Sequence, residues 1–425
     1  MGPTPYVFIT DIDLAKEAYN RNELSGRPKT AFSNLVSNDN YTDVLFADFS
    51  PKWLALRRVA HLAVRKYSIV DRLPQLIANI VDQTVSLMLN REDINTGFQT
   101  FDYIYLLFLN IMAASVFGKI YDIEDQEFRK LNYIFHDFFK ENAQRLTFHE
   151  FMPVLQYVDR EVVRRRKQYI ADTRELVQSK YISHYNDFNE TDIRDLCDAL
   201  ILAKREAIRD SKESAVYLND DNITMVIWDL FIGGVDTTHN TFKWLLLLLA
   251  KHPDCQQRLR NEIEVNIGDR LPVQEDRHRC HYTMAFIAET MRYRLVVPLA
   301  MYHKAVVDTR IVNHNIPKGT GIFVHHYHIL NDVKQWESPD QFKPERFLDS
   351  DGKYVTIRPP AYIAFGLGRR SCLGEKLAQV SLFLVLVRLL QNTSAYNIDV
   401  ESEANLEANY QIIDSLQPYD YKLTK

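Results

Sequence analysis

The sequence has few cysteines, and none of them are paired at a spacing typical of disulfide frameworks or metal sites. Its four cysteines, at positions 197, 255, 280 and 372, are spread through 425 residues without a C-x-x-C motif. This pattern argues against a disulfide scaffold and against a structural zinc site. It is typical of a protein in a reducing compartment.

A long apolar run is also missing. The longest extends from Trp244 to Ala250 and is bounded by Lys243 and Lys251, whereas a membrane-spanning helix needs about 20 apolar residues. The first residues, MGPTPYVFITDIDLAKEAY, lack the basic-then-apolar pattern of a signal peptide. We therefore expect neither a membrane span nor a secretory leader in this sequence.

Positive charge does not predominate. Lysine and arginine number 51 against 56 aspartates and glutamates, which gives a net charge of −5. Because nucleic-acid binding requires a basic face, no nucleic-acid partner is expected. The hydrophobic fraction of 46% and the charged fraction of 25% are typical of a globular protein.

Apolar residues recur at helical spacing through the first two thirds of the chain. We predict helices over 12–20, 51–66, 71–91, 98–118, 125–145, 153–184, 190–208, 221–251 and 253–267, and a last long helix over 373–391. Short strands are expected over 6–10, 306–307, 310–315 and 321–326. The sequence therefore predicts one mainly α domain with a small β portion.

A cysteine follows a glycine-rich loop directly before the last predicted helix. Residues 365–374 read FGLGRRSCLG, with Cys372 as the cysteine and Arg370 two positions before it. Backbone N–H groups of the loop and of the helix start are expected to surround the sulfur, lower its pKa and favour the thiolate. A lone cysteine there is more often structural, but five spaced positions match Phe-x-x-Gly-x-Arg-x-Cys-x-Gly.

This loop resembles the cysteine-ligand loop of the cytochrome P450 family. The resemblance implies the P450 fold and haem b (iron-protoporphyrin IX), with Cys372 as the axial ligand of the iron. It also implies that Arg370 pairs with a haem propionate. Phe365, Gly366 and Gly374 belong to the same loop and are expected to contact the haem.

The central predicted helix carries the residues GGVDTT at 233–238. An acid followed by a hydroxyl beside a glycine weak point suits proton delivery to bound oxygen, although a kinked helix with a solvent-facing acid explains the same residues. The segment resembles the oxygen-activation motif of the P450 family, which implies catalytic roles for Asp236 and Thr237. Gly233 stands where alanine is commoner, and we expect it to widen the space over the haem.

Three charged residues match a further motif of that family. Glu289 and Arg292 lie three positions apart and so share one helix face, and Arg346 follows in the stretch PERF. Alone, such a pair is a common surface feature. The resemblance implies that the three form a buried ion network with a structural role.

Trp53 and Arg57 lie four positions apart, on one face of a predicted helix. Both side chains only donate hydrogen bonds, which suits a carboxylate such as a haem propionate. An ordinary amphipathic tryptophan with an exposed arginine is the alternative, but the pair resembles the Trp-x-x-x-Arg helix of the P450 family. His303 matches the position of a third propionate partner.

Several stretches, including DLCDALILAK at 195–204, resemble the microsomal animal branch of the family. That branch holds steroid 17α-hydroxylase/17,20-lyase and the aryl-hydrocarbon hydroxylases. Asn142 matches a residue that binds a substrate ketone there, although a surface helix asparagine is the simpler interpretation. Gly233, Val297 and Ile413 are the further candidates for the substrate wall.

The resemblance implies a haem-thiolate monooxygenase that hydroxylates a small lipophilic substrate. A steroid is favoured, and a broad xenobiotic or fatty-acid monooxygenase is the alternative. Electrons are expected from NADPH–cytochrome P450 reductase, with cytochrome b5 as a second candidate partner, at the cytoplasmic surface of the endoplasmic reticulum membrane.

Two other readings stay open at this point. A haem-thiolate isomerase or dehydratase would not need the hydroxyl of Thr237. The second alternative is a short form of the protein without catalytic activity. Residues 1–425 are expected to form the catalytic domain without the membrane anchor and first helix of the family, and a domain that lacks packed elements is expected to be less stable.

Overall fold

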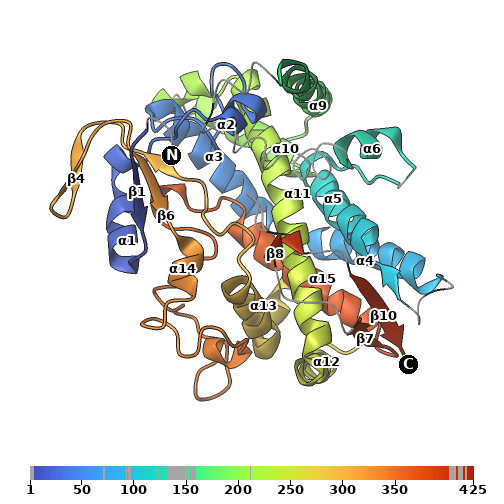
Figure 1. Cartoon of the computed structure of the whole chain (residues 1–425). Coiled ribbons are helices and arrows are strands. Elements are labelled where there is room, and N and C mark those ends of the chain that lie inside the picture. The colour runs from blue at the N-terminus through green and yellow to red at the C-terminus, as the bar shows by residue number, and fades with distance from the viewer. Residues whose placement is uncertain are drawn as a thin grey trace.

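The computed structural model describes residues 4–69, 72–91, 93, 97–122, 124–132, 149, 152, 159–210, 212–401, 408–409, 415–416 and 419–425. It is mainly helical with small sheets, as the sequence predicts (Figure 1). The α-helices are α1 (Ile12–Asn20), α2 (Ala31–Val36), α3 (Pro51–Tyr67), α4 (Arg72–Leu89), α5 (Phe101–Phe117), α6 (Gln126–Asn132), α9 (Arg160–Asn186), α10 (Leu196–Arg209), α11 (Asp220–Lys251), α12 (Pro253–Asn266), α13 (His281–Tyr293), α14 (His326–Leu330) and α15 (Glu375–Asn392).

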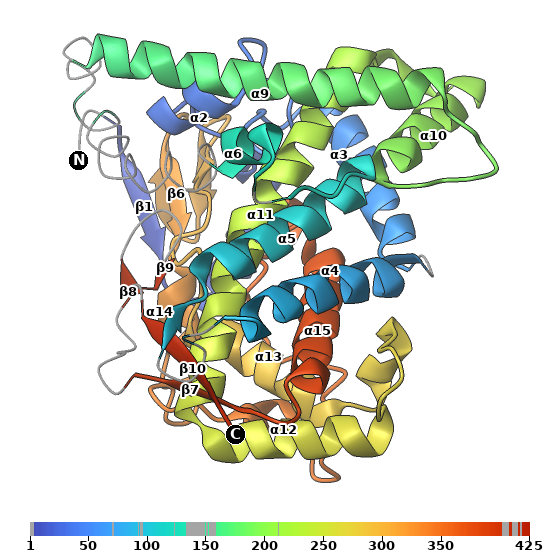
Figure 2. The same ribbon diagram turned by 90° about the vertical axis from the view of Figure 1, so that its right-hand side faces the viewer.

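Helix α11 forms the centre of the molecule. It begins after Asn219, whose side chain accepts a hydrogen bond from the backbone N–H of Asn222 at 2.8 Å. The helix continues unbroken through Gly233 and Gly234 and is buried along nearly its whole length, as its apolar composition on all sides requires. Helices α9 and α12 lie across its two ends (Figure 2).

The strands form small sheets at the edges of the helical body. Strand β1 (Tyr6–Ile9) pairs in parallel with β6 (Gly321–Val324), and β6 pairs antiparallel with β3 (His303–Lys304). Tyr6 lies opposite Gly321 in this register. A second sheet consists of β2 (Phe98–Gln99), β10 (Asp420–Thr424) and β7 (Asn397–Val400), in that order. The described residues also form two hairpins: β4 (Thr309–Ile311) with β5 (His314–Ile316), and β8 (Ala408–Asn409) with β9 (Ser415–Leu416).

Two of the predicted strands are wrong. Residues 306–307 are not in a strand, because the backbone N–H of Val306 donates to the carbonyl of Glu23 outside the sheet. The single strand predicted over 310–315 is the β4–β5 hairpin, whose turn holds Val312 at a φ of 51°.

The glycine-rich loop before α15 packs directly against the end of α1. Gly368, in the short 3-10 turn Gly368–Arg370, has a φ of +69°, and a Cβ atom on it would lie 2.2 Å from the carbonyl oxygen of Tyr19. Only glycine fits both the left-handed backbone and this close approach.

Among the described residues, no helix is both long enough and apolar enough to cross a membrane.

Candidate functional site

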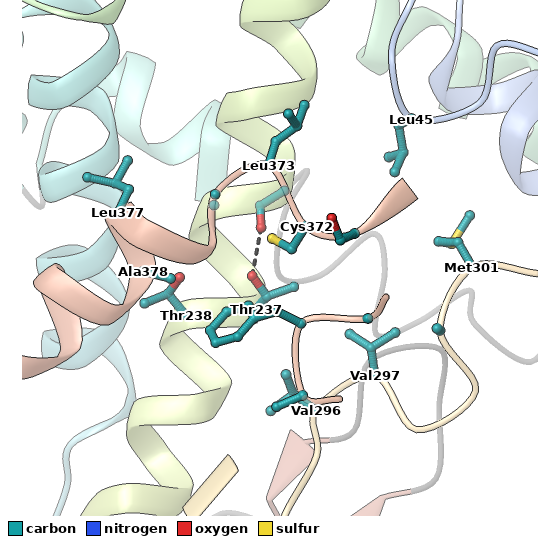
Figure 3. Close-up of a pocket in the computed structure, with 18 of the residues that line it drawn as sticks. Leu45, Thr237, Thr238, Val296, Val297, Met301, Cys372, Leu373, Leu377 and Ala378 are labelled. Atoms are coloured by element: carbon teal, nitrogen blue, oxygen red, sulfur yellow. Dashed lines mark hydrogen bonds between the residues drawn. The ribbon is translucent and has the colours of Figure 1, made fainter. Parts of the chain in front are cut away.

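A cavity of about 350 Å³ lies between α11 and the loop that precedes α15. Most of its walls are apolar, with contributions from Leu45, Val297 and Met301. Cys372 from the loop and Thr237 from α11 face each other across it (Figure 3). A cysteine and a helical hydroxyl are thus brought together although 135 positions separate them in the sequence.

The loop holds the sulfur of Cys372 at the cavity wall. The backbone N–H of Cys372 donates to the carbonyl of Phe365 at 2.9 Å, and the N–H groups of Gly374 and Glu375 donate to the sulfur. Cys372 is exposed to the cavity. The protein atoms around its sulfur nevertheless displace solvent and raise the pKa of the thiol above its ordinary value, which outweighs the lowering by these N–H groups and by Arg57. The expected net lowering is therefore wrong for the protein alone, whereas a metal cation bound to the sulfur would deprotonate it.

Four arginines line the same cavity, Arg294 and a group of three near Cys372: Arg27, Arg57 and Arg370. Within the described ranges none of these three forms an ion pair; they donate to backbone carbonyls of the surrounding loops instead. Burial lowers the pKa of Arg27 to about 10. Burial, followed by the charges of Arg27 and Arg57, holds the pKa of Arg370 well below its usual range.

This arrangement fits a bound dianion. The buried Nη1 atom of Arg370 has no hydrogen-bond partner in the described part of the chain, and unpaired buried charge is costly. The two propionates of haem would supply carboxylates to these guanidinium groups, beside a sulfur that suits iron. The residues present therefore fit the haem that the sequence resemblance implies. Arg27 is not among the site residues predicted from the sequence.

Trp53 differs from its predicted role. Its indole N–H, the only donor of the side chain, donates to the carbonyl of Val44 at 3.0 Å. Trp53 is 1% exposed and lies beneath Arg370, whose guanidinium carbon is 4.2 Å from the ring centroid. The ring thus supports Arg370 by a cation–π contact and is not directed at a carboxylate.

His303 lines the cavity but is held as a neutral imidazole. Its Nδ1 lies 2.9 Å from the carbonyl of Leu24, so Nδ1 carries the proton and Nε2 is left as an acceptor. Burial, and then the charges of Arg27 and Arg370, hold the pKa of His303 well below its usual range. Donation to a propionate, as predicted, would require a second proton on this ring.

The glycine pair and the acid–hydroxyl pair of α11 have separate environments. The hydroxyl of Thr237 donates to the carbonyl of Gly233 at 2.6 Å (Figure 3). A Cβ on Gly233 would meet nothing within 4 Å, whereas one on Gly234 would collide with the side chain of Met112. Gly233 therefore leaves open space at the cavity, as the sequence predicts, and Gly234 allows α5 to approach α11.

Asp236 is buried in the body of the protein and does not line the cavity. The Nδ2 of Asn240 donates to its Oδ1 at 3.2 Å. Burial raises the pKa of Asp236 to about 7, in spite of the opposing effects of Lys243 and Asn240. The alternative of a solvent-facing acid is thereby wrong, and this carboxyl exchanges its proton near neutral pH.

The structure also brings the three charged motif residues together. Arg292 donates to both carboxylate oxygens of Glu289, at 2.7 and 2.8 Å, and the Nε of Arg346 lies 3.3 Å from Glu289. The side chains of Glu289 and Arg292 are 0% exposed. The remaining donors of Arg292 bond to the carbonyls of Leu330 and Pro339, so the pair is fully satisfied.

The other candidates divide into two groups. Residues Phe365, Gly366, Gly374, Gly233 and Val297 line the cavity. Asn142 and Ile413 lie outside the described residues.

Comparisons with known proteins agree with this site. A family model described as "Cytochrome P450" matches residues 1–421. Steroid 17-alpha-hydroxylase/17,20 lyase of Squalus acanthias is 30% identical over 430 residues, which cover 100% of this chain and 83% of that protein. Cytochrome P450 1A1 of Canis lupus familiaris is 32% identical over 402 residues, covering 92% and 76%. A solved structure described as "Zebra fish cytochrome P450 another structure with Progesterone" has a TM-score of 0.85 at 26% identity, covering 100% of this chain and 95% of that chain.

Proposed function

The chain belongs to the cytochrome P450 family, and we propose that it is a monooxygenase that hydroxylates a steroid in the cavity between Cys372 and Thr237. The reaction of the family consumes O2, two electrons and two protons, places one oxygen atom in a C–H bond and releases the other as water. Haem supplies the binding and reductive activation of O2. The observation that carries the proposal is the facing pair of Cys372 and Thr237 in an apolar cavity.

In this proposal the chain holds the cofactor through two kinds of contact. The Sγ of Cys372 binds the iron, and Arg27, Arg57 and Arg370 hold the propionates. The support is that these arginines already lie at the cavity without carboxylate partners among the described residues. Trp53 and His303 act by positioning Arg370 and by filling the wall, since their donors are engaged by backbone carbonyls.

The same proposal gives α11 the supply of protons. Thr237 presents its hydroxyl to the cavity, and its bond to the Gly233 carbonyl fixes the direction of that hydroxyl. Asp236, one position earlier and buried, holds a proton that it releases near pH 7. An acid of that pKa is well matched to repeated proton transfer at neutral pH.

Replacing Asp236 with asparagine is expected to change the pH dependence of stability. The carboxyl has a pKa of about 7 in the folded protein and an ordinary value of 3.8. Its ionised form is therefore disfavoured in the fold, and the stability present below pH 3.8 is lost as the pH rises toward 7. We expect the free energy of unfolding of the asparagine variant, relative to that of the parent, to increase by about 2–3 kcal/mol as the pH is raised from 5 to 8.

Urea denaturation of both proteins at the two pH values measures this difference. Glu345→Gln, at an exposed residue, is the matched control and should show no such gain. An Asp236→Asn profile parallel to the parent profile would show that the carboxyl does not titrate in this range.

As the substrate, we propose a steroid in preference to an aromatic xenobiotic. The support is the relatives named steroid 17-alpha-hydroxylase/17,20 lyase and a similar structure whose description includes progesterone. The relatives named cytochrome P450 1A1, at comparable identity, support the alternative of a broad oxidase. The test is NADPH-dependent turnover of progesterone and of benzo[a]pyrene with the reductase. Hydroxylated progesterone is expected, and oxidation of the arene alone would contradict the steroid proposal.

The electron donor is proposed to be NADPH–cytochrome P450 reductase at the surface of the endoplasmic reticulum membrane. Arg58, Arg65 and Lys66 are exposed on α3, the helix that also carries Arg57. Arg369 is exposed in the loop next to Cys372. Such a basic surface would attract an acidic partner to the thiolate side of the site.

A further inference from the structure

A second cavity, of about 730 Å³, lies apart from the one that holds Cys372. Its walls come from segments that are distant in the sequence: the loop 38–42, helix α9, residues 216–219 and the first turns of α11, with Lys52 from α3. Among the described residues, none lines both cavities. The volume is of the size typical of small-molecule sites, so this cavity is large enough to bind a ligand of its own.

The walls of the second cavity carry charges of both signs. Arg174 of α9 and Lys52 of α3 are cationic, and Glu175 of α9 and Asp221 of α11 are anionic. Within the described ranges, none of these four side chains forms an ion pair, either with one another or with another residue. Two positive and two negative charges are therefore held apart around one cavity.

Arg174 is the charge that gains most from a ligand, because its side chain is partly buried. In the described part of the chain its guanidinium group makes one hydrogen bond, from Nη1 to the carbonyl of Ser37 at 3.0 Å. Burial lowers the pKa of Arg174 below its ordinary value, and the charge of Asp39 opposes this only in part. Nε and Nη2 are left as a planar fork of donors, which a carboxylate matches with two parallel hydrogen bonds.

The two acids give the same cavity a place for positive charge. Glu175 and Asp221 are exposed, so water solvates them while no ligand is bound. Asp221 lies in the first turn of α11, where the N-terminal end of a helix stabilises a carboxylate. A simple anion would meet repulsion from these acids, and a simple cation would meet repulsion from the arginine and the lysine. Charge complementarity thus favours a ligand with one charge of each sign.

We propose that this cavity binds a small zwitterion, whose carboxylate lies against Arg174 and Lys52 and whose ammonium group lies against Glu175 and Asp221. Binding is non-covalent, and no reaction takes place on the ligand. The site is additional to the oxidation at the first cavity and does not depend on which substrate is oxidised there.

The test compares three probes of similar size on the haem-loaded protein. 4-Aminobutyrate carries both charges, butyrate carries only the negative charge and butylamine only the positive one. Calorimetry gives the three dissociation constants, and the haem absorption spectrum is recorded in the same titrations. We expect 4-aminobutyrate to bind about tenfold more tightly than either of the other probes. The haem spectrum should not change, because the ligand binds away from the iron.

Substitutions that each remove one charge give a signature that a structural role would not produce. We expect Arg174→Gln to weaken 4-aminobutyrate about tenfold and to leave butylamine within twofold of the parent. Asp221→Asn is expected to weaken 4-aminobutyrate about threefold, since the acid is exposed, and to leave butyrate within twofold. Lys52→Gln tests the carboxylate contact from α3, independently of any change in α9. Arg164→Gln is the matched control, because Arg164 is exposed on α9 and does not line the cavity.

Several results would overturn the inference. These are equal binding of 4-aminobutyrate and butyrate, no binding of any probe to the parent, a shift of the haem band on binding, or equal losses in Arg174→Gln and Arg164→Gln. Binding of the parent to phosphatidylcholine vesicles that is lost in Arg174→Gln, without binding of 4-aminobutyrate, would overturn it in favour of a lipid headgroup. The expected pattern supports the site whether or not the protein hydroxylates progesterone, so the two proposals fail separately.

Discussion

Glu289→Gln is expected to destabilise the folded protein by about 3–5 kcal/mol, one of the largest effects of any single polar substitution. The charge of Arg292 would remain fully buried after its partner had become neutral. Arg346 would lose the same partner, and the backbone N–H of Lys343 would lose the charge of its acceptor. The effect is large because removing one member of a buried ion pair leaves an uncompensated charge in a medium of low polarity.

The free energy of unfolding from urea denaturation measures this effect. Glu345→Gln is a matched control, because Glu345 pairs with Arg258 at the surface, where both side chains are about half exposed. Breaking an exposed pair of this kind is expected to cost less than about 1 kcal/mol. Equal, small losses in the two variants would show that the Glu289 network does not stabilise the fold.

The second large effect is expected for Gly368→Ala, which we predict to prevent stable haem retention. A Cβ at this position would lie 2.2 Å from the carbonyl oxygen and 2.6 Å from the carbonyl carbon of Tyr19. These are backbone atoms at the end of α1 and cannot rotate away, so the loop itself must move. Cys372 lies four residues later in that loop, and its sulfur would leave its place in the cavity wall.

Gly352→Ala is the control for backbone strain. Gly352 has a φ of +74°, close to the +69° of Gly368, but a Cβ there would meet nothing within 4 Å, and the residue does not line the cavity. The left-handed conformation costs about 1–2 kcal/mol in either variant. The haem content per chain after gel filtration should therefore fall at least tenfold for Gly368→Ala and change little for Gly352→Ala. Similar haem content in the two variants would contradict the close approach to Tyr19.

Periodicity predicts most of the helices, because their apolar faces pack on a common core. The predicted helix 12–20 coincides with α1, and 221–251 differs from α11 by one residue. Helix α13 lies outside the predicted helices, although the Glu289–Arg292 spacing is helical. The strands were predicted less well, because short strands depend on partners: Val306 bonds to Glu23, far away in the sequence.

Motif spacing locates the site, but it does not give the environment of each group. The cavity places Cys372, Thr237 and Arg370 together, as the family resemblance implies. The acceptor of Trp53 is a backbone carbonyl of the loop at Val44, and loop geometry is not readable from side-chain patterns. The net pKa of Cys372 likewise depends on the desolvation of its sulfur by the protein around it, which opposes the N–H groups that the motif predicts.

Two residues of the site are absent from the sequence-based prediction. Arg27 is buried and donates to backbone carbonyls. Only the three-dimensional structure shows that no carboxylate among the described residues pairs with it, and this is what indicates an anion contact. Asp229 lies four and eight positions before Gly233 and Thr237. Helical spacing alone places it on the cavity face of α11, so this acid was predictable from the sequence.

The most direct test of the account is the absorption spectrum of the reduced, carbon monoxide-bound protein, with Cys372→Ala as control. If the Sγ of Cys372 binds the haem iron, the parent shows the red-shifted Soret band of a thiolate-ligated haem and the alanine variant lacks it. A parent band at the position typical of histidine or neutral thiol ligation would contradict the assignment of Cys372. It would also remove the basis for monooxygenase chemistry at this cavity.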